Sequence, residues 1–213
     1  MRHAHRTVAQ RTISDTDRDR ISAAILHAES RTSGEIVCVL ARESSDATAL
    51  PILLAALAAL FVPWPLVALT ALPVNAILIL QLMTFFVLSL ILCIPRVRIS
   101  LVPRPARRAM AYRMAMEQFM IRGIGRKPDR TGVLIFVSLA ERYARIVADR
   151  AIDDLVPRRQ WQEAVEVLVA HTSRGNIADG FIGAVDICGR VLEQNFPRTA
   201  SSGSELPDRI YEV

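Results

Sequence analysis

The chain has 213 residues, enough for one domain of ordinary size with a core that can fold alone. Although 52% of the residues are apolar and 22% are charged, the window from Ala47 to Pro95 contains no Asp, Glu, Lys or Arg. A helix that crosses a bilayer needs about 20 apolar residues, and this window supplies enough for two. The composition therefore excludes an ordinary water-soluble protein and predicts the lipid bilayer as a partner.

The net charge of +5 does not indicate a nucleic-acid partner, because the basic excess collects beside the apolar window instead of forming a patch with aromatic residues. Three cysteines without paired spacing argue against a disulfide scaffold or a zinc site and favour a reducing compartment. The polar amino terminus has no apolar segment of the kind found in a signal peptide. The arginines that follow the window are Arg96, Arg98, Arg104, Arg107, Arg108 and Arg113.

The first predicted elements are a flexible arm over residues 1–14, a helix and a strand. Ser14 followed by two aspartates is typical of a helix start, and apolar residues repeat at helical spacing to about Ser30. The β-branched apolar run Glu35–Ala41 predicts a buried strand. Before this strand, the turn at residues 32–34 carries Gly34 where we expect a sharp bend.

The uncharged window, residues 48–95, predicts a helical hairpin, since about 45 apolar residues at 1.5 Å each cover two crossings. Turn signals occur at Pro63-Trp64-Pro65 and at Pro73-Val74-Asn75. The second position is favoured, because it gives spans of about 50–72 and 76–94, whereas the first leaves a short span of about 13 to 16 residues. Pro63 then lies within or near a kink of the first helix.

The remaining chain predicts a helix at 105–122, strands at 132–139 and 143–148, and two more helices. Pro157 opens the first of these helices, and Asn176 is expected to cap the second. From Pro197 the chain becomes rich in Ser, Gly and Pro, so residues 197–213 are predicted to be a disordered tail. Residues 15–46 and 100–196 therefore form one split α/β domain with a mixed sheet, interrupted by the hairpin.

Four segments of this chain match a known family in order: residues 32–37, 130–138 and 147–150, and the helical region 157–192. Together they resemble the TPM domain family, in its bacterial membrane branch with a hydrophobic hairpin inserted in the domain. The resemblance extends over nearly all of residues 18–196 and implies a compact α/β/α layered domain. Other members of the family are associated with accessory roles beside membrane components, with acid phosphatase activity or with divalent-cation binding, so the resemblance does not decide whether this chain is an enzyme.

One set of polar residues is expected to meet at a single edge of the sheet. If the two longer strands run parallel, they begin at the same edge, and the third strand ends there. Carboxylates and hydroxyls at this edge, hereafter the rim, could hold a hard cation such as calcium or magnesium, while arginines could hold a phosphate. Solvated loop charges are the alternative interpretation. The predicted metal ligands are Glu35, Asp129, Asp149 and Asp153, the predicted anion ligands are Arg130 and Arg150, and the other rim residues are Thr32, Ser33, Thr131 and Asp154.

The leading functional hypothesis is a membrane-anchored accessory or binding module that acts beside another membrane component, such as a second membrane protein. The alternative is a metal-dependent acid phosphatase of low specificity that works at the rim. No standard catalytic signature is present, and the catalytic residues stay unknown. The arginines after the second span predict a multi-pass protein of the bacterial inner membrane, with both termini and the TPM-like domain in the cytoplasm.

Overall fold

The computed structural model describes residues 12–44, 49–126, 131–198, 207 and 209–213. The chain divides into two compact units. One unit comprises residues 1–44 and 111–213, and the other comprises residues 45–110. The boundaries of 15–46 with 100–196 for the split domain and 48–95 for the insertion stay predictions.

A four-stranded mixed sheet forms the centre of the larger unit, with strand order β3-β2-β1-β4. Strands β1 (Glu35–Ala41) and β2 (Gly132–Ser138) are parallel, and Glu35 lies opposite Gly132. Strand β3 (Tyr143–Ala148) runs antiparallel to β2, whereas β4 (Ile210–Glu212) runs parallel to β1. The parallel pairing that brings the rim residues to one edge is therefore confirmed.

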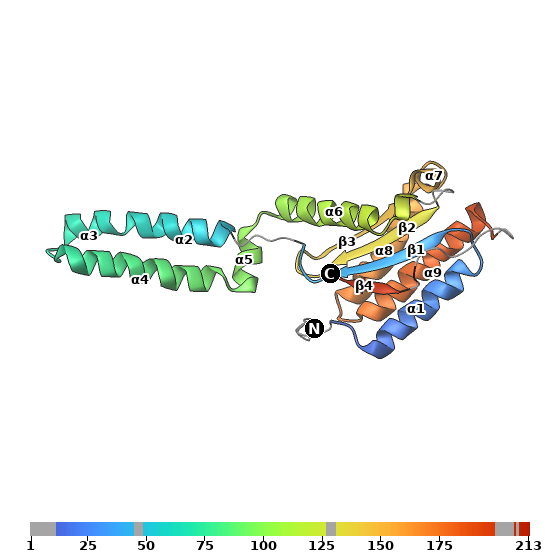
Figure 1. Cartoon of the computed structure of the whole chain (residues 1–213), viewed down its shortest axis with the longest axis horizontal. Helices are drawn as coiled ribbons and strands as arrows, with labels where there is room; N and C mark the ends of the chain where they lie inside the picture. Colours follow the sequence, from blue (N-terminus) through green and yellow to red (C-terminus); the bar gives the residue numbers. More distant parts are fainter. Residues whose placement is uncertain (1–11, 45–48, 127–130, 199–206, 208) are drawn as a thin grey trace, which may run out of the picture. The chain divides into compact units, whose positions relative to one another are not determined.

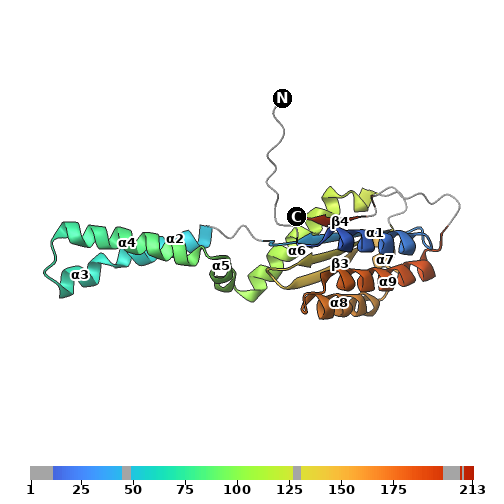
Figure 2. The ribbon, with the colours of Figure 1, turned by 90° about the horizontal axis from the view of Figure 1, so that it is seen from below.

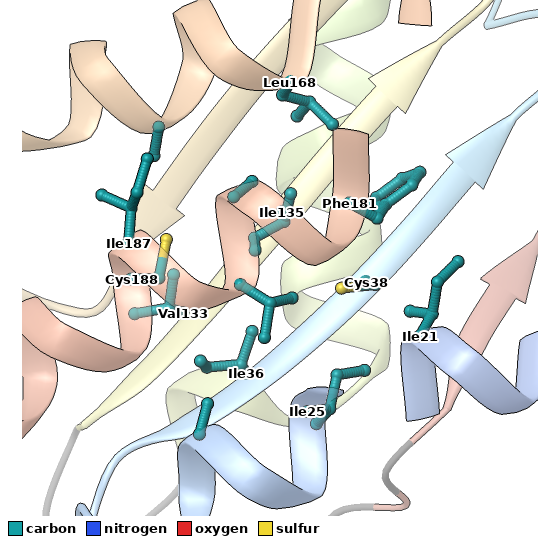
Figure 3. Packing of buried hydrophobic residues seen from close by; sticks show 14 of the residues in the cluster. Ile21, Ile25, Ile36, Cys38, Val133, Ile135, Leu168, Phe181, Ile187 and Cys188 are labelled. Atoms are coloured by element: carbon teal, nitrogen blue, oxygen red, sulfur yellow. The ribbon is translucent and has the colours of Figure 1, made fainter. Parts of the chain in front are cut away.

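Helices cover both faces of this sheet (Figures 1 and 2). On one face, α1 (Asp15–Glu29), α8 (Arg158–Thr172) and α9 (Ile177–Asn195) pack over alternate residues of β1 and β2. Figure 3 shows Phe181 and Cys188 of α9 pointing toward the strands in this cluster. On the other face, α6 (Arg104–Ile121) and the 3-10 turn η1 (Ile124–Arg126) cover Val37, Val39 and Phe136.

The helix boundaries follow local capping chemistry in part. Ser14 Oγ accepts a hydrogen bond from Asp17 N at 3.1 Å, which confirms the predicted start of α1. Gly123 has φ +72°, the left-handed conformation that ends α6. Asn176 is the N-cap residue of α9, as predicted, but its side chain makes no capping hydrogen bond, so that part of the prediction is wrong. The short helices α5 (Pro95–Leu101) and α7 (Arg150–Asp153) were not predicted.

The smaller unit contains two stretches long and apolar enough to cross a membrane, by length and composition: Ala49–Leu69 and Val74–Leu92. The first comprises α2 (Ala49–Phe61) and α3 (Pro63–Leu69), with Pro63 opening the second piece, and the second is α4 (Val74–Leu92). The break between them falls at residues 70–73, the favoured of the two proline positions. Helices α2 and α4 lie side by side, with the small residues Ala55 and Ala59 of α2 buried.

The structure differs from the sequence expectations at both ends of the chain and at Gly34. Ile13 is 4% exposed in the core, although residues 1–14 were predicted to be a flexible arm, of which 1–11 lie outside the described residues. Residues 210–212 form β4, although 197–213 were predicted to be disordered. Gly34 does not have a positive φ; a Cβ there would lie 2.9 Å from Leu192 Cδ1, so close packing explains this glycine.

Candidate functional site

Three neighbouring strands place Glu35, Gly132 and Asp149 in one row across the sheet at the rim. Glu35 begins β1 opposite Gly132, and Asp149 N donates to Gly132 O at 2.9 Å immediately after β3. Side chains alternate along a strand, so Glu35 shares the face of Val37, which α6 covers. Glu35 is 2% exposed and Asp149 8% exposed. The rim therefore holds two buried carboxyl groups.

Gly132 separates these two carboxyl groups, and its missing side chain makes room for Ile124. A Cβ on Gly132 would lie 2.2 Å from Ile124 Cγ2. Ile124 is 1% exposed and belongs to the apolar cluster under α6. Neighbouring strands lie about 4.8 Å apart, so the backbones of Glu35 and Asp149 are about 10 Å apart with Ile124 packed over the glycine between them. The two carboxylates would have to reach across this distance, past Ile124, to share one cation.

Asp149 also has a local structural role. Its Oδ1 accepts a hydrogen bond from Arg150 N at 2.6 Å, and Asp149 is the N-cap of α7. Its Oδ2 is buried and has no hydrogen-bond partner within the described part of the chain. A buried carboxylate oxygen without a partner is costly, so this atom is the rim's strongest candidate for contact with a cation or a donor.

The hydroxyl groups of the rim are used by the backbone. Thr32 Oγ1 donates to Phe196 O at 2.5 Å and accepts from Gly34 N at 3.1 Å. Thr131 Oγ1 donates to Ser33 O at 3.2 Å. These bonds hold the turn before β1 against the start of β2 and the end of α9. Both threonines are therefore structural residues of the rim.

Sequence reasoning missed one buried carboxylate near this edge, Glu29. Its Oε1 accepts a hydrogen bond from Ile36 N at 2.7 Å, and its side chain comes from the last turn of α1. A glutamate is electrostatically unfavourable at a helix C-terminus. An acidic residue in the last turn of a predicted helix, just before a strand, could therefore have indicated that Glu29 is held by a buried hydrogen bond.

The remaining predicted ligands are exposed wherever the structure describes them. Arg150, Asp153 and Asp154 are exposed on or beside α7. Asp129 and Arg130 lie outside the described residues. Among the residues that are described, no three His, Cys, Asp or Glu side chains form a group that could hold a metal ion. The predicted cation site and the predicted phosphate contact therefore remain expectations.

The opposite edge of the sheet carries a closed polar network. Ser44 Oγ donates to Ser138 Oγ at 2.8 Å, and Ser138 Oγ donates to Glu141. Ser44 N also donates to Glu141 Oε1 at 3.0 Å and to Oε2 at 3.1 Å. Ser138 is fully buried and Glu141 is 7% exposed. The network holds Ser44, in the segment that follows β1, against the turn between β2 and β3.

A pocket of about 350 Å³ adjoins this network. Its walls come from the end of β2, the start of β3 and the last turn of α8, and Arg142, with φ +50°, is one of its lining residues. The carboxyl ends of parallel strands are the usual ligand side of open α/β sheets, and this volume is within the range of small-ligand sites. The apolar lining residues are Val137, Leu139, Ala144 and Val169, and the polar ones include Ser138, Tyr143, Thr172 and Ser173.

The buried cysteines are not candidates for nucleophilic chemistry. Burial raises the pKa of the Cys188 thiol to about 12. Burial, with smaller contributions from Cys188 and Glu29, raises the pKa of Cys38 well above its ordinary value. A thiol needs a lowered pKa and access to solvent to react as a nucleophile. Both cysteines are therefore core residues, as Figure 3 shows.

Comparisons with known proteins support the fold. The family model described as the TPM domain matches residues 95–191, which include α6, β2, β3, α8 and most of α9. No match was found among curated proteins. A solved structure, the NMR structure of the BA42 protein from the psychrophilic bacterium Bizionia argentinensis, is 18% identical, with 96% of this chain and 98% of that chain covered and a TM-score of 0.62. The chain thus contains a TPM domain match over 95–191 and shares a mixed α/β fold with that protein.

Proposed function

We propose that this protein is a membrane-anchored TPM-like module that binds another membrane component. The observation that carries the proposal is the exposure of the two apolar helices: only 11% and 6% of their most apolar windows are buried. A core helix of a soluble protein would be mostly covered, and large exposed apolar surfaces mark contacts with a membrane or a partner. A bilayer supplies the missing cover for both helices.

Charge distribution supports a defined orientation in the membrane. The break at residues 70–73 has no charge, whereas six arginines occur between residues 96 and 113. Basic residues that closely follow a membrane span stay on the cytoplasmic side and attract anionic headgroups. The proposed location is the bacterial inner membrane, with both termini and the α/β domain in the cytoplasm.

The binding role is proposed for the pocket beside Ser138. Four residues, 45–48, join Ser44 of the polar network to α2 along the chain. A ligand or peptide segment held by this pocket would thus bind next to the point where the chain leaves the α/β domain for the apolar helices. Apolar walls with a few hydroxyl groups suit a segment of another membrane protein better than a highly charged substrate.

Cysteine accessibility in intact cells tests this topology. Cys38 and Cys188 are buried, so single cysteines introduced at the exposed positions Arg174 and Leu72 report the domain and the break between the helices separately. In a chain whose Cys93 is replaced by serine, an impermeant maleimide should label position 72 and leave position 174 unlabelled until the membrane is permeabilised. Labelling of position 174 in intact cells would contradict a cytoplasmic domain.

The alternative function is a metal-dependent phosphatase at the rim. It is favoured by one observation, the buried Asp149 Oδ2 that lacks a hydrogen-bond partner within the described residues. In this proposal, calcium or magnesium would be held by Asp149 with Glu35, Asp129 and Asp153, and Arg130 and Arg150 would contact the phosphate. Hard cations prefer several carboxylate or carbonyl oxygens. The name of the matched family model, which includes the word phosphatase, agrees with this alternative.

A thermal shift with added cation distinguishes the two functions. A cation that binds only the native state raises the melting temperature as its concentration increases. Asp149→Asn should weaken this response while the amide oxygen still caps α7, and Asp186→Asn, on the exposed side of α9, is the matched control. If millimolar calcium and magnesium shift neither protein and no phosphate ester is hydrolysed above background, the alternative is wrong.

A further inference from the structure

The C-terminal strand β4 binds the edge of β1 as a peptide ligand would. It consists of three residues, and Cys38 pairs with Ile210, Val39 with Tyr211 and Leu40 with Glu212. Beyond the strand, Val213 N donates to Leu40 O and Arg42 N donates to Val213 O, both at 3.0 Å. Main-chain bonds of this kind provide affinity when an extended segment adds to a sheet edge.

Each side chain of β4 has its own recognition contact on the domain. Ile210 is 6% exposed and enters the core cluster shared with α1 and α9. The Tyr211 ring lies on the other face, with the Arg122 guanidinium 3.6 Å from its centroid. Glu212 forms an ion pair with Arg18 of α1 and accepts a hydrogen bond from Thr12 N at 3.1 Å. The edge thus selects an apolar, an aromatic and an acidic residue in succession.

The connection between β4 and the rest of the domain is longer than the path it must follow. Pro197 forms a bridge with Thr32, and Ile210 lies opposite Cys38. Six residues, from the turn before β1 into the strand, separate these two points, a distance of at most about 20 Å. The thirteen peptide steps from Pro197 to Ile210 can extend to about 43 Å. The connection therefore does not force β4 onto its own domain.

We propose that the β1 edge is an acceptor site for the C-terminal strand of a second copy of this chain, so that two copies can exchange β4. A second copy is the occupant because every copy carries the complementary residues Ile210, Tyr211 and Glu212. Within one chain, the short connection gives β4 an effective concentration in the millimolar range, which favours its own edge in dilute solution. Exchange becomes dominant where copies are crowded or where a strand fits its own edge poorly. This proposal does not depend on the membrane anchor.

A pair of charge reversals makes each chain's own edge unfavourable. In Arg18→Glu, the chain's own Glu212 meets a glutamate, and in Glu212→Arg, the chain's own Arg18 meets an arginine. When the two variants exchange strands, both edges of the mixed dimer regain an opposite-charge pair. Like charges at such contacts are penalised and opposite charges are favoured, so exchange should be driven in the mixture and in neither variant alone.

The experiment mixes the two full-length variants, each with a different affinity tag, in one detergent, and measures how much of one is recovered with the other. We expect recovery about tenfold above a mixture of two wild-type chains, a ratio that corresponds to about 1.4 kcal/mol. A chain that carries both Arg18→Glu and Glu212→Arg regains an opposite-charge pair with its own strand, so it should associate no more than wild type. Association through the apolar helices is common to all mixtures and cancels in this comparison.

A matched control uses the second ion pair of α1. Arg20 pairs with Asp179 of α9 at 2.6 Å, within the helical layer and away from the C-terminal strand. A mixture of Arg20→Glu and Asp179→Arg should show no increase in recovery. If the Arg18 and Glu212 mixture recovers no more than this control, strand exchange between copies is wrong.

A labelled peptide of residues 207–213 provides a measurement in case a reversal lowers expression. Wild-type peptide should bind the Glu212→Arg chain more tightly than a peptide with Ile210→Asp, because Ile210 enters the core. The Arg18→Glu chain should bind a peptide with arginine at position 212 more tightly than the wild-type peptide, which has glutamate there. Absence of saturable binding, or peptide binding without association in the mixture of variants, would overturn exchange.

Discussion

At the residue scale, Gly132 shows how one missing side chain organises the rim. Its place between Glu35 and Asp149 is filled by Ile124, so the glycine makes the loop before β2 pack onto the sheet. Gly132→Ala should lower the free energy of unfolding by about 1–3 kcal/mol, because an added methyl would overlap Ile124 Cγ2. Urea denaturation measures this loss. In an Ile124→Ala background the same glycine substitution should cost clearly less, and an equal cost in both backgrounds would show that Ile124 is not the obstacle.

The two buried thiols predict a pH dependence at the same scale. Burial raises the pKa of Cys188 in the folded domain to about 12, so below about pH 8 its thiol is protonated in both the folded and the unfolded chain and has little effect on stability. As the pH rises from 9 toward 12, the unfolded thiol ionises while the folded one cannot, and stability falls by at most about 1.4 kcal/mol per pH unit for each thiol. Unfolding measured at pH 8 and pH 10 should show this decline. Cys188→Ala should reduce it, and an equal decline in both proteins would contradict the assignment.

At the scale of elements, the strands show what a local pattern can and cannot predict. The apolar β-branched run of β1 and the partly alternating pattern of β3 predict the boundaries that the structure shows, because the first is typical of a strand buried on both faces and the second of a strand buried on one. Strand β4 has only three residues, and its partners Arg18, Arg122 and Leu40 lie far away in sequence. A local sequence pattern therefore could not predict that residues 210–212 form a strand.

The sequence predicted which residues lie at the rim, but not the hydrogen bonds that their side chains make. The parallel pairing of β1 with β2 brings Glu35 and Asp149 to one edge, as the topology required. The hydroxyl groups of Thr32 and Thr131 could not be assigned from sequence, because their acceptors are carbonyl oxygens of residues 196 and 33. The pocket beside Ser138 was also missed, since its walls combine a strand end with the last turn of α8.

The junction between α1 and β1 makes a separate prediction. Glu29→Ala would leave the buried Ile36 N–H without its acceptor at 2.7 Å, which should cost about 1–3 kcal/mol in unfolding free energy. Glu29→Gln keeps an oxygen in the same place and is the matched control, so it should cost clearly less. Thermal unfolding compares the two variants. Equal losses would show that the charge of Glu29, and not its hydrogen bond, stabilises the junction.

At the scale of the whole molecule, the α/β domain and the apolar helices are separate compact units. The core of the domain draws on both chain segments, with Ile21 and Ile36 from the first and Phe181 from the second. Replacing residues 48–95 with a short flexible linker should therefore leave a water-soluble protein that unfolds in one transition. Calorimetry tests this expectation, and aggregation at every linker length would show that the apolar helices are required for folding.

Alkaline carbonate extraction tests whether Ala49–Leu69 and Val74–Leu92 anchor the protein in a bilayer. Cells that express the full chain, or the chain with residues 48–95 replaced, are lysed, and their membranes are washed at high pH. The full chain should stay in the membrane pellet, and the shortened chain should appear in the soluble fraction. Release of the full chain into the wash would contradict membrane anchoring.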